Sequence, residues 1–351
     1  MRHQQTIEIA GRKIGPNEKP YVLAEMSGNH NNDINRALKL IDAAAEAGAD
    51  GVKLQTYTAD TITIDIRTGE FLLDDGGLWH GRTLYDLYQE ASTPWEWHEE
   101  LFAHAKKRGI ACFSTPFDPT AVDFLESLDA PAYKIASLEL TDVDLIAKVA
   151  QTGKPMIISN GMGSMGEIDE AVRVARANGC KDLILLKCTS AYPALPRDAN
   201  LSTMNVLREA FDCQVGLSDH TMGTHVPIAA VTLGATVIEK HFTLRRADGG
   251  VDSAFSLEPE ELAQLVRESA EAHEAVGVPT FGSPEAEATS RRSRRSLYVV
   301  KDIKAGEVFD DTNIRSIRPG LGLPVKHRPE FMGRTARRDI KRGTPVSWDL
   351  F

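Results

Sequence analysis

Two histidines, each at the end of a short apolar run, are the residues of this sequence best placed to do chemistry. His220 ends the run GLSDH and His241 ends the run IEKH. Because side chains alternate along a strand, Ser218 would share a face with His220, and Glu239 with His241. If the two runs are neighbouring strands, their carboxyl ends lie about 5 Å apart and both imidazoles can reach one ion. The pattern therefore predicts a divalent metal site, and the alternative is two structural histidines held by hydrogen bonds.

The number of protein ligands bears on which metal this would be. Catalytic zinc usually has three protein ligands. Two imidazoles, completed by water and substrate oxygens, suit a six-coordinate Mn2+ or Mg2+, and imidazole favours Mn2+, with Co2+ as a further alternative. An ion held by His220 and His241 would act as a Lewis acid on a carbonyl oxygen.

Polar side chains also end the other predicted strands. Lys53 and Lys134 are the informative ones, because a folded interior buries charge only when the charge is paired or liganded. Two lysines among hydroxyls would suit a ligand that carries a phosphate and a carboxylate. The alternative is that each lysine pairs structurally with Glu25 or Glu139. The whole group comprises Glu25, Asn29, His30, Lys53, Gln55, Ser114, Thr115, Lys134, Ser137, Glu139, Ser159, Asn160, Thr189, Ser190, Tyr192, Ser218, Asp219, His220 and His241.

The elements that must position these side chains are β-type runs alternating with helical segments. Such alternation indicates βαβ units and a parallel sheet. Eight units over about 250 residues is the size of a (β/α)8 TIM barrel, whose active sites lie where the strands end. An open doubly wound sheet would need a Gly-rich fingerprint after its first strand, and residues 25–30 do not form one. The predicted strands cover 21–27, 51–57, 110–117, 132–139, 155–162, 183–190, 214–221 and 237–244.

Several segments lie outside this repeat. Residues 6–20 are expected to form a hairpin or lid, and 58–94 a loop insertion on the carboxyl side of the strands, where barrel enzymes build substrate loops. A catalytic barrel over 1–278 would be followed by a linker at 279–295 and a small β-rich module at 296–351. The aromatic side chains of the insertion and of the residues just after it would either cover a sugar face or form a loop core: Trp79, Tyr85, Tyr88, Trp95 and Trp97.

The composition excludes several classes of protein. The chain has 351 residues, 42% of them hydrophobic, and a formal net charge of −10, which argues against a general nucleic-acid or anionic-membrane binder. No run of about 18 apolar residues could span a membrane, and no signal-peptide core is expected at the N-terminus. The cysteines Cys112, Cys180, Cys188 and Cys213 lack zinc-finger spacing, which predicts reduced thiols and a cytoplasmic location. Cys112 and Cys188 are expected to be small core residues.

Six motifs, taken together, resemble the sialic acid synthase family over most of the chain, and the final module resembles the antifreeze-like (SAF) domain of these enzymes. Asn32 departs from the pattern, because many relatives have Gly there, and Ser190 replaces the Asn of neuraminate-forming members. The motifs are AE-X3-NHN at 24–31, VK-X-QT at 52–56, FSTPF at 113–117, YKIAS at 133–137, SDHT at 218–221 and EKHFT at 239–243. Four further stretches resemble the subgroup that makes pseudaminic acid: 24–30, 76–79, 93–98 and 246–256.

The resemblance implies a C–C bond-forming transferase. Phosphoenolpyruvate would condense with an acetamido-sugar aldehyde, 2,4-diacetamido-2,4,6-trideoxy-L-altrose for this subgroup, and give a nonulosonic acid and phosphate. An N-acetylneuraminate or legionaminate synthase is one alternative, and a non-catalytic carbohydrate-binding protein on the same scaffold is another.

The resemblance also implies a role for each matching residue. The metal ligands His220 and His241 would be catalytic together with Lys53 and with Glu25, the general base for an attacking water. Enol-phosphate binding would fall to Lys53, Thr115, Lys134, Ser137, Ser159, Ser190 and Ser218. Sugar binding would fall to Gln55, Glu139, Tyr192, Asp252 and Arg318.

A domain-swapped homodimer is the assembly that the resemblance implies, with the small module bringing Arg318 to the partner's barrel. Pro319 restricts the backbone of Arg318, and Gly320 and Gly322 permit close approach. An extended linker over 279–295 would reach up to roughly 55 Å, enough for its own barrel or a neighbour's. The alternative is that Arg318 is a surface residue in a turn.

Overall fold

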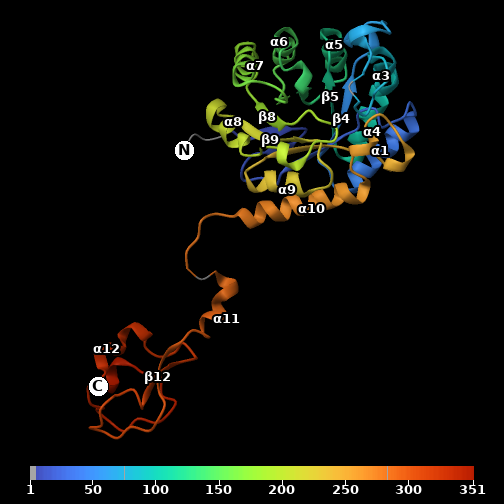
Figure 1. Ribbon diagram of the computed structural model, residues 1–351. Coiled ribbons are helices and arrows are strands. Elements are labelled where there is room, and N and C mark those ends of the chain that lie inside the picture. Colours follow the sequence, from blue (N-terminus) through green and yellow to red (C-terminus); the bar gives the residue numbers. More distant parts are fainter. Residues whose placement is uncertain (1–4, 75, 283) are drawn as a thin grey trace. The chain divides into compact units, whose positions relative to one another are not determined.

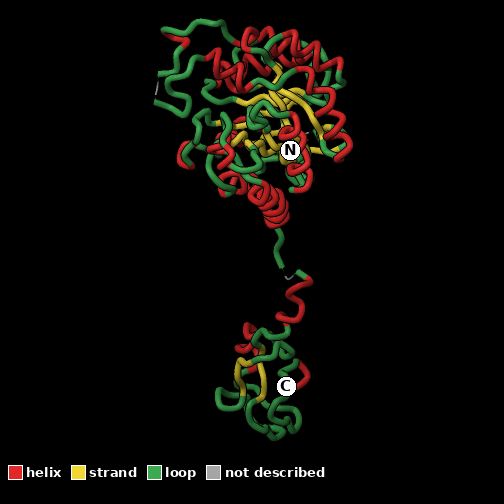
Figure 2. Tube along the Cα trace, turned by 90° about the vertical axis from the view of Figure 1, so that its right-hand side faces the viewer, coloured by secondary structure: helices red, strands yellow, loops and turns green. Residues whose placement is uncertain are grey.

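The computed structural model describes residues 5–74, 76–282 and 284–351, and the chain divides into two compact units between Gly277 and Val278. The first unit is a closed barrel of eight parallel strands surrounded by helices, which confirms the predicted fold class (Figures 1 and 2). In chain order the barrel strands are β3 (Tyr21–Glu25), β4 (Gly51–Thr56), β5 (Ala111–Pro116), β6 (Tyr133–Ile135), β7 (Met156–Ser159), β8 (Leu183–Cys188), β9 (Gln214–Asp219) and β10 (Val237–His241).

The register of the last strand brings the predicted metal ligands and base together. β10 lies between β9 and β3, with Glu239 opposite Ser218 on one side and His241 opposite Glu25 on the other. Because parallel strands end at the same edge of a sheet, side chains from the first and last strands of the repeat meet at one mouth. The barrel closure therefore joins residues that are far apart in the chain.

An N-terminal hairpin closes the amino-terminal end of the barrel. It consists of β1 (Ile7–Ile9) and β2 (Arg12–Ile14), paired antiparallel, as predicted for 6–20. Its three isoleucines are buried in one cluster with inward-facing strand residues such as Tyr21, Phe113 and Ile184. The hairpin is thus a plug at the bottom of the barrel and does not act as a lid over the strand ends.

The helices pack one apolar stripe each against the outside of the barrel. Capping residues mark their starts: Asp33 accepts a hydrogen bond from Asn35 N, and Ser164 forms a capping box with Glu167. Such caps contribute about 1 kcal/mol each to helix stability. The helices of the barrel repeat are α1 (Ile34–Glu46), α4 (His98–Arg108), α5 (Pro119–Ser127), α6 (Val143–Ala150), α7 (Met165–Ala177), α8 (Thr203–Phe211), α9 (His225–Thr232) and α10 (Pro259–Val276). Within the described part of the chain, none of the helices is long and apolar enough to cross a membrane.

The segment 58–94 between β4 and α4 carries two short helices of its own, α2 (Ala59–Ile62) and α3 (Leu84–Ala91). Its position follows a strand end, so it stands at the mouth of the barrel. Short 3-10 turns also occur along the barrel chain, at Gly69–Phe71, Trp95–Trp97, Ser137–Glu139, Pro196–Asp198, Arg246–Asp248 and Ser253–Phe255.

The second unit has a small core of its own. An antiparallel pair, β11 (Ser296–Val299) and β12 (Ile314–Ile317), packs Leu297, Val299 and Ile314 against buried residues such as Phe309 and Phe331. The unit also contains two single-turn helices, α11 (Ala288–Arg291) and α12 (Arg328–Phe331), and 3-10 turns at Glu285–Glu287, Val325–His327 and Trp348–Leu350. This is the β-rich module that the sequence predicts.

Candidate active site

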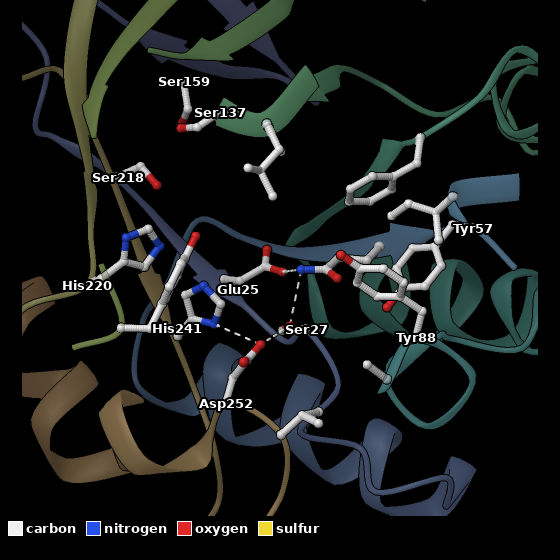
Figure 3. Close-up of a pocket in the computed structure, with 18 of the residues that line it drawn as sticks. Glu25, Ser27, Tyr57, Tyr88, Ser137, Ser159, Ser218, His220, His241 and Asp252 are labelled. Atoms are coloured by element: carbon white, nitrogen blue, oxygen red, sulfur yellow. Dashed lines mark hydrogen bonds and ion pairs between the residues drawn. The ribbon is translucent and has the colours of Figure 1, made fainter. Parts of the chain in front are cut away.

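A cavity of about 240 Å³ lies at the carboxyl ends of the barrel strands (Figure 3). Its floor consists of polar strand-end side chains, and its wall consists of apolar side chains from the segment 58–94 and the loop after β10. Most of the predicted site residues line it: Glu25, Lys53, Gln55, Lys134, Ser137, Ser159, Tyr192, Ser218, His220, His241 and Asp252.

Four predicted residues do not line this cavity. Thr115 lies behind it, where its hydroxyl accepts a hydrogen bond from Lys53 Nζ at 3.0 Å. Glu139 is in the 3-10 turn after β6, and Ser190 Oγ lies 3.9 Å from Cys188 Sγ. Arg318 belongs to the second unit, so its predicted role stays a prediction.

The two histidines face each other across one side of the floor. Their ring centroids are 5.2 Å apart. His220 Nδ1 lies 2.9 Å from Thr189 O, and because a carbonyl can only accept, Nδ1 carries a proton; Nε2 is then the nitrogen that a neutral His220 ring would offer to a cation. His241 Nδ1 is buried without a hydrogen-bond partner, 3.6 Å from Asp252 Oδ2. Burial, followed by the charges of His220 and Lys53, lowers the pKa of His241 well below its usual value, which keeps its imidazole neutral.

This pair fits the requirements of a divalent cation. Metals bind the neutral form of imidazole, the form that burial favours at His241. Across residues 5–74, 76–282 and 284–351, no cluster of three or more His, Cys, Asp or Glu side chains has the arrangement of a metal site. A cation held by this pair would take its remaining ligands from water or substrate.

A buried cluster of two lysines and two glutamates fills the centre of the floor. Lys53 Nζ lies 2.6 Å from Glu25 Oε2 and 3.8 Å from Glu239 Oε1, while Lys134 Nζ lies 3.5 Å from Glu239 Oε1. Ser218 Oγ donates to the same Glu239 oxygen at 3.1 Å. Buried charges persist only when they are paired, and here two cations balance two anions. Lys53 therefore pairs with Glu25, as the structural alternative expected, whereas the partner of Lys134 is Glu239 and not Glu139.

Some polar atoms of the floor remain unsatisfied. Glu239 Oε2 and Ser159 Oγ are buried and make no hydrogen bond to any described residue. Folded proteins rarely leave such groups without a partner, because each costs about 1–3 kcal/mol. Because both residues line the cavity, a polar ligand bound there could supply the missing hydrogen bonds.

Two carboxyl groups near the floor have unusual acidity. Burial raises the pKa of Glu25 to about 7, with Lys53 lowering it and Glu239 raising it further. Burial likewise raises the pKa of Glu139 to about 7, against the lowering effect of Lys134. Carboxylates with a pKa near neutrality are suited to exchanging protons with a substrate or a water.

Sequence reasoning missed some residues that line the cavity. Glu239 shares a face with His241 by alternation, yet it was absent from the predicted site residues. Cys188 is buried, as expected of a small core residue, but it also lines the cavity, and its Sγ lies 3.9 Å from His220 Nδ1. The same alternation could have placed it, because Leu186 and Cys188 lie two positions apart on β8, and Leu186 belongs to the barrel-interior cluster.

The apolar wall comes mainly from the segment 58–94. Trp79 Nε1 donates to Val251 O at 2.9 Å, and the Trp79 ring lies 5.6 Å from that of Tyr192. Among the aromatic side chains of this region, Trp79 and Tyr88 line the cavity, while Trp95 stacks on Phe124 of α5 at 4.7 Å. The apolar lining of the wall comprises Ile62, Leu73, Trp79, Leu84, Leu87, Tyr88, Ala91 and Val251.

The loop after β3 packs tightly against the loop after β10. A Cβ on Gly28 would lie 2.3 Å from Val251 Cγ2, so glycine is required for the two loops to meet. Asn29 Nδ2 donates to Phe242 O and to Ser256 Oγ, each at 2.9 Å. The departure at Asn32 has a conformational explanation: its φ of 55° lies in the left-handed region, which glycine adopts freely and asparagine tolerates.

Comparisons with known proteins agree with this geometry. The model of the NeuB family matches residues 40–280, and that of the SAF domain matches residues 294–351. The chain is 44% identical to the pseudaminic acid synthase of Helicobacter pylori, over 95% of this chain and 98% of that protein. It is 39% identical to the N,N'-diacetyllegionaminic acid synthase of Campylobacter jejuni, over 92% and 98% respectively.

A solved structure is similar as well. The N-acetylneuraminic acid synthetase of Leptospira borgpetersenii, crystallised with citrate, superposes with a TM-score of 0.73 at 33% identity, over 82% of this chain and 95% of that one. The family match, the relatives and the barrel with its C-terminal module lead to the same assignment: the chain belongs to the NeuB family and carries a SAF domain.

Proposed function

We propose that this chain makes pseudaminic acid from phosphoenolpyruvate and 2,4-diacetamido-2,4,6-trideoxy-L-altrose, in a metal-dependent reaction that releases phosphate. The observation that carries the proposal is the cavity floor, where the buried Lys53 and Lys134 lie beside the facing imidazoles of His220 and His241. The similarity to curated pseudaminic acid synthases, at 43–44% identity, supports the choice of this product.

The reaction requires one new carbon–carbon bond and one broken carbon–oxygen bond. C3 of the enol phosphate attacks the aldehyde carbon of the open-chain sugar, and positive charge develops at C2. Water adds at C2 and loses a proton, and the tetrahedral intermediate then expels phosphate by cleavage of the C–O bond. The enzyme must therefore bind a trianionic enol phosphate, orient an aldehyde and place a base near C2.

The lysine–serine floor would bind the enol phosphate. Lys134 and its neighbours Ser137, Ser190 and Ser218 would hold the phosphate, because cations and hydroxyl donors together suit its oxygens. Lys53, with Thr115 behind it, and Ser159 would complete the enol-phosphate site. The unsatisfied Ser159 Oγ supports this arrangement.

The imidazole pair would hold the cation. The neutral His241 and Nε2 of His220 fit a divalent ion, for which Mn2+ is our choice, with Mg2+ or Co2+ as alternatives. When bound, such an ion supplies Lewis-acid polarisation of the aldehyde oxygen. The protein's own part in this step is to hold both imidazole rings in place. The Thr189 carbonyl accepts a hydrogen bond from His220, and the Phe255 ring packs against His241.

Glu25 would be the general base for the water. Its pKa of about 7 lets it accept a proton near neutral pH, and the Lys53 ammonium beside it stabilises the ionised form. Gln55 Nε2 donates to Glu25 Oε1 at 3.0 Å and so orients the carboxylate. The Glu25 carboxylate, which would take the proton from water, is thus held by Lys53 at one oxygen and by Gln55 at the other.

The remaining cavity would take the sugar. Gln55, Tyr192 and Asp252 line this space and would supply polar contacts, and the Trp79–Tyr88 wall would supply apolar surface. Glu139, in the 3-10 turn after β6, would contact the sugar from beside the cavity. A substrate with a methyl group at C6 and two acetamido methyl groups matches such a wall better than a fully hydroxylated sugar, because burying an unpaired hydroxyl is costly.

The division of the chain and its assembly are part of the same proposal. The barrel, 1–278, would be the catalytic domain, with 58–94 as its substrate loop, and the linker 279–295 would carry the SAF domain, 296–351, to the barrel of a partner. Arg318 would then contact the sugar in a cytoplasmic homodimer. Mixing two inactive variants, Arg318→Ala and His241→Ala, should restore part of the activity through heterodimers. No recovery after demonstrated subunit exchange would rule out the swap.

Product analysis with a panel of sugars tests the function. The purified protein, phosphoenolpyruvate and Mn2+ should release phosphate with the diacetamido-altrose substrate and form pseudaminic acid. Turnover of N-acetylmannosamine or of the legionaminate precursor, without turnover of the altrose compound, would reassign the product within the family. Sugar binding without phosphate release from any member of the panel would indicate a carbohydrate-binding protein.

A further inference from the structure

Ser27, directly beyond β3, has a backbone conformation that its residue type disfavours. Its φ is 47°, in the left-handed region, where a Cβ crowds the backbone and glycine is the usual residue. The side chain is buried and lines the cavity. A strained residue at a binding cavity is kept when its side chain does something that glycine could not do.

The Ser27 hydroxyl joins two groups of the cavity. It donates a short hydrogen bond to Asp252 Oδ2 and accepts one from Gln55 Nε2 at 3.1 Å. Gln55 Nε2 also donates to Glu25 Oε1 at 3.0 Å, and Asp252 Oδ2 lies 3.6 Å from His241 Nδ1. Figure 3 shows these contacts as a continuous line from Glu25 to His241, with Ser27 at its middle.

We propose that Ser27 is a positioning residue that holds the Asp252 carboxylate beside His241 and the Gln55 amide beside Glu25. The inference rests on the proposed function, because it takes His241 as a metal ligand and Glu25 as the base for the attacking water. Its physical basis is that the hydroxyl serves as donor and acceptor at once, which alanine or glycine cannot do. Outer contacts of this kind orient metal-binding histidines and the carboxylates beside them.

Two substitutions separate this role from a purely structural one. Ser27→Gly and Ser27→Ala remove the same hydroxyl, but only Ser27→Gly also removes the Cβ that the left-handed backbone disfavours. Ala10→Gly is the matched control for the backbone, because Ala10 has a φ of 48° and is exposed in the turn of the N-terminal hairpin. A positioning role predicts that both Ser27 variants lose activity, because both lack the hydroxyl. It also predicts that Ser27→Gly is the more stable of the two, because only glycine relieves the backbone strain.

The first experiment compares steady-state kinetics and thermal unfolding of the full-length variants. Both Ser27 variants should lose about tenfold or more in kcat, the usual cost of removing an outer contact. Ser27→Gly should nevertheless unfold about 2 °C or more above Ser27→Ala, because the strain is gone. Ala10→Gly should keep wild-type kcat. Wild-type kcat in Ser27→Gly would overturn the proposal, as would a loss of kcat that follows the unfolding temperature across the variants.

A double substitution tests whether Ser27 acts through Asp252. If it does, adding Ser27→Gly to Asp252→Ala should lower kcat by clearly less than the tenfold loss of Ser27→Gly alone, since only the contact with Gln55 is then left to lose. A full further tenfold loss in the double variant would show that the hydroxyl does not act through this carboxylate.

A titration with Mn2+ alone keeps this inference distinct from the proposed function. Holding the Asp252 carboxylate beside His241 should favour a dication, so Ser27→Gly should bind Mn2+ about tenfold more weakly than wild type. This readout needs no sugar: if wild type turned over no substrate, the proposed function would fail while the weaker Mn2+ binding would still support the positioning role. Equal Mn2+ affinities in wild type and Ser27→Gly would overturn it.

Discussion

The floor of the cavity is formed by residues at strand ends, whereas its wall is formed by residues of irregular loops. Floor residues such as Lys53, Lys134 and Glu239 are charged, almost fully buried and paired with one another. Wall residues such as Trp79 and Leu87 are apolar and come largely from a single inserted segment. The floor thus holds the parts that any reaction of an enol phosphate with an aldehyde would need, and the wall holds the parts that could distinguish one sugar from another.

If the two regions divide the work in this way, changes in the floor should impair the chemistry, and changes in the wall should impair sugar binding. The largest effect is expected for His241→Ala. Loss of one of two metal ligands should lower kcat at least about a thousandfold, equivalent to about 4 kcal/mol of transition-state stabilisation.

Enol-phosphate binding, measured by calorimetry, should change little in His241→Ala, because the lysines and serines that bind it remain. His225→Ala, an exposed histidine at the start of α9, is the control and should keep full activity. Chelation should abolish wild-type activity and added Mn2+ should restore it. Full turnover by metal-free His241→Ala would refute the metal site.

Lys134→Met should have the next largest effect. It removes a phosphate contact and leaves Glu239 with one buried cation fewer, so the KM for phosphoenolpyruvate should rise about a hundredfold. The free energy of unfolding should fall by about 3–5 kcal/mol, the usual cost of breaking a buried pair.

Lys148→Met is the matched control for this change. Lys148 also contacts a carboxylate, Asp123 at 2.5 Å, but the pair is exposed, so the substitution should cost less than about 1 kcal/mol. Denaturant unfolding and initial rates measure both quantities. Equal losses of stability in the two variants would mean that the floor charges are not coupled as their distances indicate.

The pH dependence of kcat/KM is expected to show the ionisation of Glu25. A base must be deprotonated, so kcat/KM should fall about tenfold per pH unit below about 7, the pKa to which burial raises this group. Glu25→Gln should be far less active and should lose this acidic limb. Glu139→Gln, whose carboxyl also has a pKa of about 7, should retain it. An acidic limb that disappears in Glu139→Gln instead would move the role of base to Glu139.

The same ionisation has a consequence of opposite sign for stability. Because the folded state holds the Glu25 proton more tightly than the unfolded state, with a pKa of about 7 against 4.5, this contribution to stability is present below pH 4.5 and is lost as pH rises through about 7. Urea unfolding at a series of pH values should therefore show a smaller loss of stability towards neutral pH in Glu25→Gln than in wild type.

The smallest effect is expected in the wall. Trp79→Phe removes the hydrogen bond to Val251 O, so the sugar KM should rise about fivefold, matching a loss of about 1 kcal/mol, with kcat nearly unchanged. Trp95→Phe is the control, because Trp95 Nε1 has no hydrogen-bond partner among the described residues and the ring stacks outside the cavity. A fall in kcat without a change in sugar KM for Trp79→Phe would contradict the division between wall and floor.

Local rules were enough to predict most of the floor. The eight strands could be predicted because short apolar runs alternate with helical segments, and the direction of a strand-end side chain follows from a period of two. Lys53 with Gln55, and Ser218 with His220, were assigned to common faces in this way, and all four line the cavity. The convergence of strand ends is a property of every parallel barrel, so it required no knowledge of this one.

The errors and omissions occurred where a contact depends on register or loop path. Lys134 meets Glu239 and not Glu139 because β10 closes the barrel between β9 and β3, and no local pattern states that register. The position of Cys188 inside an apolar run indicates that it is buried, as it is, but does not indicate that it lines the cavity. The insertion 58–94 has no period that predicts which of its aromatic side chains face the cavity.

The sequence by itself determined the order and type of the elements, the family and most of the polar residues of the site, because caps, periodicity and strand-end motifs act over a few residues. Only the tertiary structure decided which charges pair and which loops touch. Ser27 and Asp252 lie 225 positions apart, and their hydrogen bond exists because barrel closure brings the first and last strands together. The left-handed backbone at Ser27, against the preference of the residue itself, is likewise visible only in the folded chain.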